Sequence, residues 1–327
     1  MKRFDCVLAI GFLLLGGCQM RKTVPVEEGM ANVNGVELYY KIIGEGEPVV
    51  ILHGGPGFDH NYMLPMRELA DGYRIIFYDQ RATGNSTGAV DANSITVDHF
   101  VEDLEGLRAE LKLGRMNVIG HSWGAGLAMF YGIKYPDKLG KMILLGCGGA
   151  GTEYFGEHFE NIQKNTSPED SLAMKQIEQS EAFKNKEIKA FEQYYRIAVK
   201  PFFYDKSLPD HLDFTYGKNT VKNQMEVANL LMKDLRDFDI YNELSTIKCP
   251  ALIIQGDSDL LPCEATYKLH KHIAQSKLVF LKNTGHFILH ESPDQVFPII
   301  RDFLKDDKSV ASKIPPEIEG ELKSVSF

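Results

Sequence analysis

The chain has 327 residues, of which 44% are hydrophobic and 25% charged, and its formal net charge is −9. This composition is that of an ordinary soluble globular protein. The length suits one core of about 200 to 250 residues with an insertion. The acidic balance argues against a nucleic-acid-binding protein, because phosphate binding needs clustered Lys and Arg.

The N-terminus has the features of a targeting segment. Lys2 and Arg3 precede an apolar run at positions 7–15, which is too short to span a bilayer. The next residues complete a Leu-Gly-Gly-Cys sequence at 15–18, which resembles the lipobox of bacterial lipoproteins. We therefore predict a signal peptide over residues 1–17.

Cleavage there leaves Cys18 as the lipidated first residue of the mature chain, followed by a polar tether at 18–29. The chain is then expected to be an exported bacterial lipoprotein, on the periplasmic or outer-surface side, held at the membrane only by its lipid anchor. A plain secretory signal with an incidental cysteine is the alternative.

Three of the five cysteines lie beyond this segment, namely Cys147, Cys249 and Cys263. They form no disulfide framework, and no CxxC pair or histidine cluster indicates a metal site, so we expect neither a metal nor another cofactor. A single Cys249–Cys263 disulfide stays open, although buried thiols are favoured.

Apolar runs alternate with helical patterns from residue 32 onward. Continuous apolar stretches are typical of strands that are buried on both faces of a parallel sheet. Apolar residues at three- and four-residue spacing over 97–111 predict an amphipathic helix. The alternation predicts an α/β fold with a mostly parallel sheet covered on both faces. The expected strands are 36–40, 49–52, 74–78, 117–119, 142–145, 251–254 and 278–281.

The pattern changes in the middle of the chain. Residues 148–242 contain no buried-strand run and are rich in Glu, Lys, Gln, Phe and Tyr, which predicts an inserted helical cap. The core is then expected over 30–147 and 243–306, and residues 307–327 form a loose polar tail. Helices are expected at 188–199 and 224–235 in the cap and at 294–304 in the core.

The motif Gly120-His121-Ser122-Trp123-Gly124 fits the G-x-S-x-G nucleophile elbow. In such an elbow the serine lies on a strained strand-to-helix turn, and a side chain at either glycine would collide with that turn. An expected strand precedes Ser122 and small residues of a helix follow it. We predict Ser122 as a nucleophile; an ordinary strand-to-helix turn is the alternative.

The other members of a catalytic triad must follow as acid and then histidine. Asp257 and Asp259 both follow an expected strand, and we choose Asp259 because it lies three residues after Gly256. His286 follows the last expected strand, where it would act as general base, oriented by the acid. His290 is the competing histidine and is expected to be structural.

The oxyanion of an acyl transfer reaction needs two backbone donors. One is the N–H of Trp123, which follows the nucleophile. The loop at 53–57, His-Gly-Gly-Pro-Gly, is expected to provide the second donor through the N–H of Gly55. Gly54 of the same loop is expected to contact the substrate. His53 is expected to anchor this loop rather than to catalyse.

Three motifs together resemble the proline iminopeptidase family of α/β-hydrolases. They are His53 to Gly57, Asp79-Gln80-Arg81 and Gly120 to Gly124, with His60 and Tyr62 as further matches. The resemblance covers about 32–146 and 250–304 and is weak across the cap. It implies an enzyme that releases N-terminal proline, and sometimes other residues, by acyl transfer to serine.

The chain departs from this family at two positions. Ala82 stands where the family often has glycine, and Leu260 stands where some members carry an acid. Recognition of a free amino terminus then needs another carboxylate, and Glu226 is the nearest cap candidate. A solvated helix face is the alternative for Glu226.

Three functions remain open at this point. The first is an aminopeptidase acting on short peptides with N-terminal proline or another small residue. The second is a broader ester, lactone or amide hydrolase with the same triad, acting on a small ester or amide. The third is a hydrolase homologue that only binds a ligand. A serine at position 122 argues against epoxide hydrolases and dehalogenases, which use a carboxylate nucleophile.

Overall fold

The computed structural model describes residues 24–212, 215–306 and 310–323. The predicted signal peptide at 1–17 and the predicted lipidation site, Cys18, lie outside these ranges and stay predictions. Within the described part of the chain, no helix is long and apolar enough to cross a membrane.

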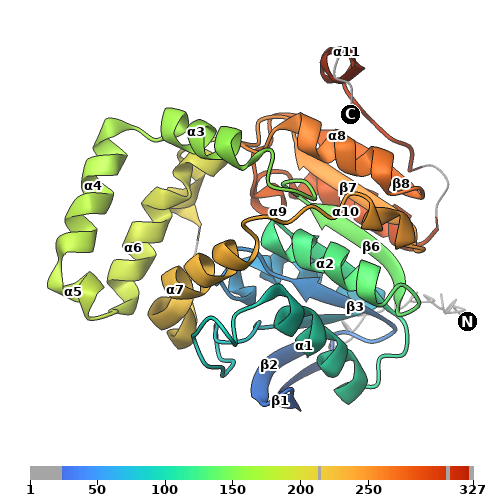
Figure 1. Cartoon of the computed structure of the whole chain (residues 1–327), viewed down its shortest axis with the longest axis horizontal. Helices are drawn as coiled ribbons and strands as arrows, with labels where there is room; N and C mark the ends of the chain where they lie inside the picture. Colours follow the sequence, from blue (N-terminus) through green and yellow to red (C-terminus); the bar gives the residue numbers. More distant parts are fainter. Residues whose placement is uncertain (1–23, 213–214, 307–309, 324–327) are drawn as a thin grey trace, which may run out of the picture.

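Strands of the described chain form one eight-stranded sheet in the order β1-β2-β4-β3-β5-β6-β7-β8 (Figure 1). Strands β4, β3, β5, β6, β7 and β8 pair in parallel with one another. Strand β2 pairs antiparallel with both β1 and β4. The predicted mostly parallel sheet is therefore confirmed. The strands are Val26–Val33, Val36–Ile43, Glu47–Leu52, Tyr73–Tyr78, Met116–His121, Leu139–Leu145, Ala251–Gly256 and Ser276–Leu281.

Alternate residues of each central strand enter two different cores, because successive side chains of a strand point to opposite faces. In β3, Val50 and Leu52 join one buried cluster, and Val49 and Ile51 join the other. The sheet is thus covered on both faces, which explains the continuous apolar runs.

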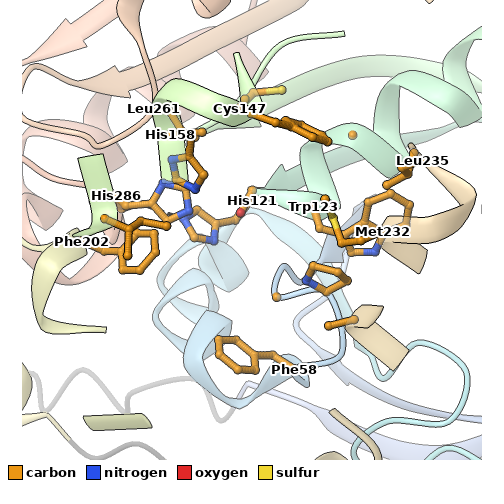
Figure 2. A pocket seen from close by; sticks show the side chains of 18 of the residues that line it. Phe58, His121, Trp123, Cys147, His158, Phe202, Met232, Leu235, Leu261 and His286 are labelled. Atoms are coloured by element: carbon orange, nitrogen blue, oxygen red, sulfur yellow. Dashed lines mark hydrogen bonds between the residues drawn. The ribbon is translucent and has the colours of Figure 1, made fainter. Parts of the chain in front are cut away.

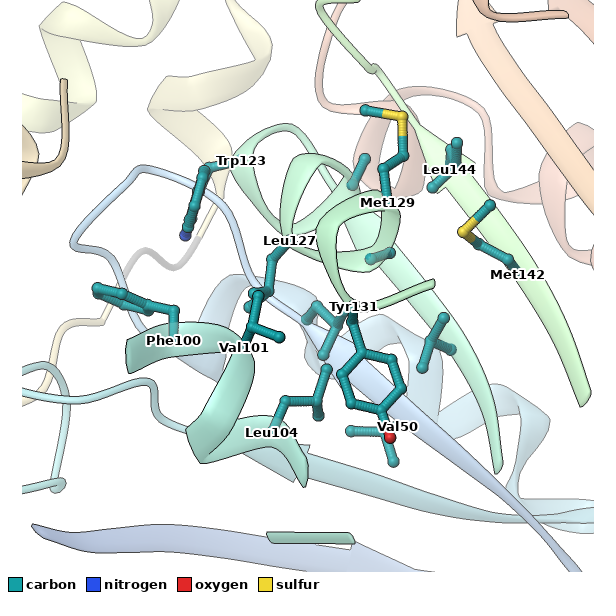
Figure 3. Close-up of a cluster of buried hydrophobic side chains, with 14 of the residues drawn as sticks. Val50, Phe100, Val101, Leu104, Trp123, Leu127, Met129, Tyr131, Met142 and Leu144 are labelled. Carbon is teal, nitrogen blue, oxygen red and sulfur yellow. The ribbon is translucent and has the colours of Figure 1, made fainter. Parts of the chain in front are cut away.

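Each cluster is completed by its own layer of helices. Side chains of α1 and α2 pack with the first cluster, which Figure 3 shows around Tyr131 and Leu127. The 3-10 helix η1 and helix α10 contribute to the second. These elements span Val97–Glu110 (α1), Trp123–Lys134 (α2), His60–Asp71 (η1), Cys263–His272 (α8), Ile288–Glu291 (α9) and Pro293–Leu304 (α10).

Two predicted boundaries are wrong. The tether predicted at 18–29 overlaps β1, which begins at Val26 and pairs along its length with β2. Only Ala31 and Val33 of this edge strand are buried, so it has no clear apolar alternation. The tail predicted as loose contains α11 (Pro316–Lys323), and Lys313 pairs with β8 through two backbone hydrogen bonds.

The segment between β6 and β7 contains the helices expected there, and we call it the cap. Figure 1 shows α3 to α6 standing to one side of the sheet, with α7 returning toward it. The cap helices are Phe155–Asn165 (α3), Pro168–Gln179 (α4), Glu181–Lys184 (α5), Ile188–Ala198 (α6) and Lys218–Asp234 (α7), with 3-10 turns at Lys200–Phe202, Leu208–His211 and Glu243–Thr246.

Candidate active site

Ser122 lies on the turn between β5 and α2 with φ 56° and ψ −120°, a region that residues other than glycine rarely adopt. A Cβ atom at Gly120 would meet the Gly124 carbonyl oxygen at 2.2 Å, and one at Gly124 would meet the Leu52 oxygen at 2.0 Å. The predicted need for glycine at both positions is confirmed. The turn presents Ser122 at the carboxyl edge of the sheet.

Asp259 and His286 follow β7 and β8, whose carboxyl ends lie at that same edge. Their side chains meet, with 2.9 Å between His286 Nδ1 and Asp259 Oδ2. The Leu261 N–H donates to the other oxygen, Asp259 Oδ1, at 3.1 Å and so fixes the carboxylate. Asp257, the alternative acid, is exposed and accepts a hydrogen bond from Ser258.

The loop that carries His286 is bonded to the cap. The His286 N–H donates to the Phe202 carbonyl at 2.7 Å. Glu291 accepts from the Gly285 N–H at 3.1 Å and from the Tyr204 N–H at 2.7 Å, so one carboxylate joins both segments. Burial raises the pKa of this carboxyl, although the backbone donors oppose the shift. Sequence reasoning missed Glu291, because a charge in a short helix carries no signal of such a role.

A buried network under Ser122 connects the first loop to the histidine loop. His121 Nε2 lies 2.9 Å from the His286 carbonyl oxygen, so it must carry a hydrogen and donate. His121 Nδ1 then accepts from the Tyr62 hydroxyl at 2.9 Å, and that hydroxyl accepts from the Gly54 N–H at 2.6 Å. Burial lowers the pKa of His121 to about 3, which keeps the ring neutral as this network requires.

Gln80 braces the loop at 53–57 from the other side. Its Nε2 donates to the His53 carbonyl at 2.7 Å, and its Oε1 accepts from the Trp123 indole N–H at 2.8 Å. His53 is fully buried and accepts from the Gln80 N–H at 3.0 Å, in agreement with its predicted anchoring role. Gly55 has φ +123°, so its conformation favours glycine.

Ser122, His286, Gly55 and Trp123 all line one cavity of about 420 Å³, which lies between the sheet edge and the cap. Figure 2 shows His286, His121 and Trp123 around this space. The cap side is mostly apolar, with contributions from Phe155, Phe159, Ile162, Tyr195, Val199, Phe202, Ala228, Met232 and Leu235. The volume is that of a site for a small molecule.

Known proteins resemble this chain over most of its length. Residues 47–293 match the family described as alpha/beta hydrolase fold. The chain belongs to this family. It is 29% identical over 298 residues to the proline iminopeptidase of Saccharolobus solfataricus, covering 86% of this chain and 93% of that protein. It is also 30% identical over 287 residues to the proline iminopeptidase of Lactobacillus helveticus (strain DPC 4571), covering 85% and 97%.

Among solved structures, this α/β-hydrolase is similar to the crystal structure of proline iminopeptidase from Mycobacterium smegmatis. The TM-score is 0.65 at 22% identity, over 86% of this chain and 98% of that one. The chain is thus a proline iminopeptidase-like α/β-hydrolase.

Two residues predicted to bind substrate in this α/β-hydrolase lie elsewhere. Gly54 does not line the cavity; its N–H bonds Tyr62, and a Cβ there would lie 2.9 Å from that of Ser122. Glu226 is exposed and lies outside the cavity. In α7 the cavity is lined by Gln224, and a residue two positions on points about 200° away around a helix.

The electrostatics of the cavity are those of a neutral site. No Asp or Glu is found among the described residues that line it. Burial lowers the pKa of His158, a cap residue that lines the cavity. Cys147 also lines it, but burial raises the pKa of this thiol to about 12, so it is protonated and a poor nucleophile.

The described ranges include Cys147, Cys249 and Cys263. Cys249 is a free thiol, so the Cys249–Cys263 disulfide does not form. Within those ranges, no group of three or more His, Cys, Asp or Glu side chains is arranged to hold a metal ion.

Proposed function

We propose that this α/β-hydrolase cleaves an amide or ester through an acyl-enzyme on Ser122. The observation that carries the proposal is the strained serine turn and the His286–Asp259 hydrogen bond at one end of one cavity. In the proposed reaction His286 takes the Ser122 proton as the hydroxyl attacks, and it returns that proton to the leaving group. Asp259 holds the imidazole by its Nδ1–H and stabilises the imidazolium.

The tetrahedral intermediate needs donors near its oxygen, and we assign these to the backbone N–H groups of Trp123 and Gly55. Support comes from their positions: both residues line the cavity beside Ser122, one at the start of α2 and one on the opposing loop. Gln80 stabilises this arrangement, because it bonds both the loop and the Trp123 side chain.

As substrates we propose short peptides with an N-terminal proline or another small residue. Support comes from two relatives that are proline iminopeptidases, each of which aligns with this chain over most of its own length. The cap also covers the cavity, which favours removal of a terminal residue over cleavage within a long chain. No described lining carboxylate is available to bind the substrate ammonium.

That last observation favours a second candidate, a hydrolase of uncharged esters, lactones or amides with an apolar acyl group. An ammonium without a paired anion is costly to bury, whereas an apolar acyl group suits aromatic walls.

One substrate panel separates the two candidates. We would compare proline p-nitroanilide, its N-acetylated form and p-nitrophenyl butyrate at pH 7.5. Cleavage of the free-amine anilide with little cleavage of the acetylated form supports the aminopeptidase. Rapid ester cleavage with no cleavage of the free-amine anilide would rule it out in favour of the second candidate.

A further inference from the structure

His158, on the cap helix α3, is a polar side chain in the mostly apolar cap wall. It lines the same cavity as Ser122 and His286. The rings of His158 and His286 both pack on Phe202, with centroid distances of 6.0 Å and 5.6 Å. In Figure 2 both rings lie at the same end of the view as Phe202.

The hydrogen bond of His158 decides which of its nitrogens can bind a ligand. Its Nδ1 lies 3.3 Å from the Leu260 carbonyl oxygen, so Nδ1 carries the hydrogen and donates. Nε2 of the neutral ring is then an acceptor, and no other hydrogen bond to this ring is found among the described residues. Burial, reinforced by the nearby His286, lowers the pKa of His158, so the ring is neutral near pH 7.

The position beside His286 indicates which part of a substrate His158 would meet. The general base must come within hydrogen-bond reach of the leaving-group atom, because it delivers the proton there. His158 packs on the same Phe202 ring as that base, so we place the leaving group, and not the oxyanion, against His158. The scissile nitrogen of a secondary amide carries one N–H, whereas the corresponding ester oxygen carries none.

We propose that His158 is a leaving-group-binding residue, whose Nε2 accepts a hydrogen bond from the N–H of the scissile amide. The inference rests on the proposed acyl transfer by Ser122 and His286, and it adds amides with an N–H leaving group as the preferred substrate class. His286 still donates the proton that completes the amine, and His158 transfers none.

The test uses pairs of substrates that differ in this one hydrogen. The p-nitroanilide and p-nitrophenyl ester of proline form one pair, and those of butyric acid form a second. His158→Asn places an amide nitrogen where Nδ1 is and keeps the bond to Leu260, but it lacks an acceptor at the Nε2 position. His158→Gln keeps an acceptor there. Asn161→Ala removes the other side-chain bond to Leu260, 3.1 Å long, without changing the cavity lining.

We expect His158→Asn to lower kcat/KM for the anilide about tenfold while changing the ester less than about twofold. His158→Gln should restore most of the anilide activity, and Asn161→Ala should affect both substrates equally. Equal losses for anilide and ester in His158→Asn, or wild-type cleavage of the esters but of neither anilide, would overturn the inference. Failure of the proposed acyl transfer is distinguishable, because Ser122→Ala would then keep activity on every substrate.

Discussion

The two walls of the cavity are built in different ways. The sheet side is a hydrogen-bonded frame, in which Tyr62, His121 and Gln80 each bond a neighbouring loop. The cap side contains packed rings, such as Phe191 on Tyr195 at a centroid distance of 4.5 Å. Hydrogen bonds fix atoms in one geometry, whereas apolar contacts tolerate changes of shape. We infer that the sheet side determines the chemistry and the cap side the choice of substrate.

The two walls are joined at loops that carry proposed catalytic groups. The Leu260 carbonyl accepts from the cap residue Asn161, directly after the proposed acid. Glu291 joins the histidine loop to the cap, and Asp59 bonds Gly217 and Thr220 of the cap at 2.7 Å each. Changes at these joints are expected to have intermediate effects, between those of the two walls.

The largest effect is expected on the sheet side. His286→Ala should lower kcat by about 10⁴- to 10⁶-fold, because the proton transfers to and from Ser122 lose their base. His290→Gln is the matched control four residues away; its ring bonds the Tyr62 carbonyl at 2.9 Å and is not a proposed base. Steady-state kinetics on the substrate panel measures both, and a similar loss in both variants would contradict the assignment.

A smaller loss is expected at the proposed oxyanion loop. In Gly55→Ala the new Cβ would lie 2.7 Å from the Phe58 nitrogen, and φ +123° disfavours any side chain. Moving the Gly55 N–H should lower kcat by about 10²- to 10³-fold. Gly72→Ala is the control, since φ there is −137° and no atom lies within 4 Å of the new Cβ. Unchanged kcat in Gly55→Ala would remove Gly55 from the proposed site.

A substitution at Glu291 should lower both the stability of the protein and its rate of catalysis. Glu291→Gln replaces one of two acceptor oxygens by an NH₂ group that faces a backbone N–H. The free energy of unfolding should fall by about 1 to 3 kcal/mol, with a loss of activity smaller than that of Gly55→Ala. The exposed Glu226→Gln should change it by less than about 0.5 kcal/mol. Urea unfolding of both variants gives the comparison, and equal stabilities would show that the joint is unimportant.

The strands and the order of the site residues could be predicted from sequence, because buried strands are continuous apolar runs and the site residues follow them. The rotation of each cap helix about its own axis, which decides which side chains face the cavity, could not be predicted. Gln224 faces the cavity and Glu226 faces solvent, and only the packing of α7 on the core decides between them. The role of Glu291 could not be predicted either, since its partners are backbone N–H groups and one of them, that of Tyr204, belongs to the cap. The edge strand β1 was missed in part because most of its side chains are exposed.

The pH dependence of the free energy of unfolding provides a further test of the sheet-side frame. Burial lowers the pKa of His53 to about 4 and that of His121 to about 3, below the ordinary value near 6.5. The unfolded chain therefore binds more protons between these values, so this stability is present above pH 6.5 and is lost as pH falls. The slope is about 1.4 kcal/mol per pH unit for each histidine.

Urea unfolding between pH 7 and 4.5 measures that slope. His53→Gln should reduce it by about 1.4 kcal/mol per pH unit, and the exposed His211→Gln should leave it unchanged. A wild-type slope retained in His53→Gln would mean that His53 is not buried as a neutral ring.

The most direct test of the proposed chemistry is covalent trapping of the serine. A fluorophosphonate reacts with an activated serine by forming an O–P bond as fluoride leaves. Peptide mapping by mass spectrometry should find one adduct per chain, on Ser122, and Ser122→Ala should lose both the adduct and hydrolysis. An adduct on a different residue, or hydrolysis retained in Ser122→Ala, would contradict the account.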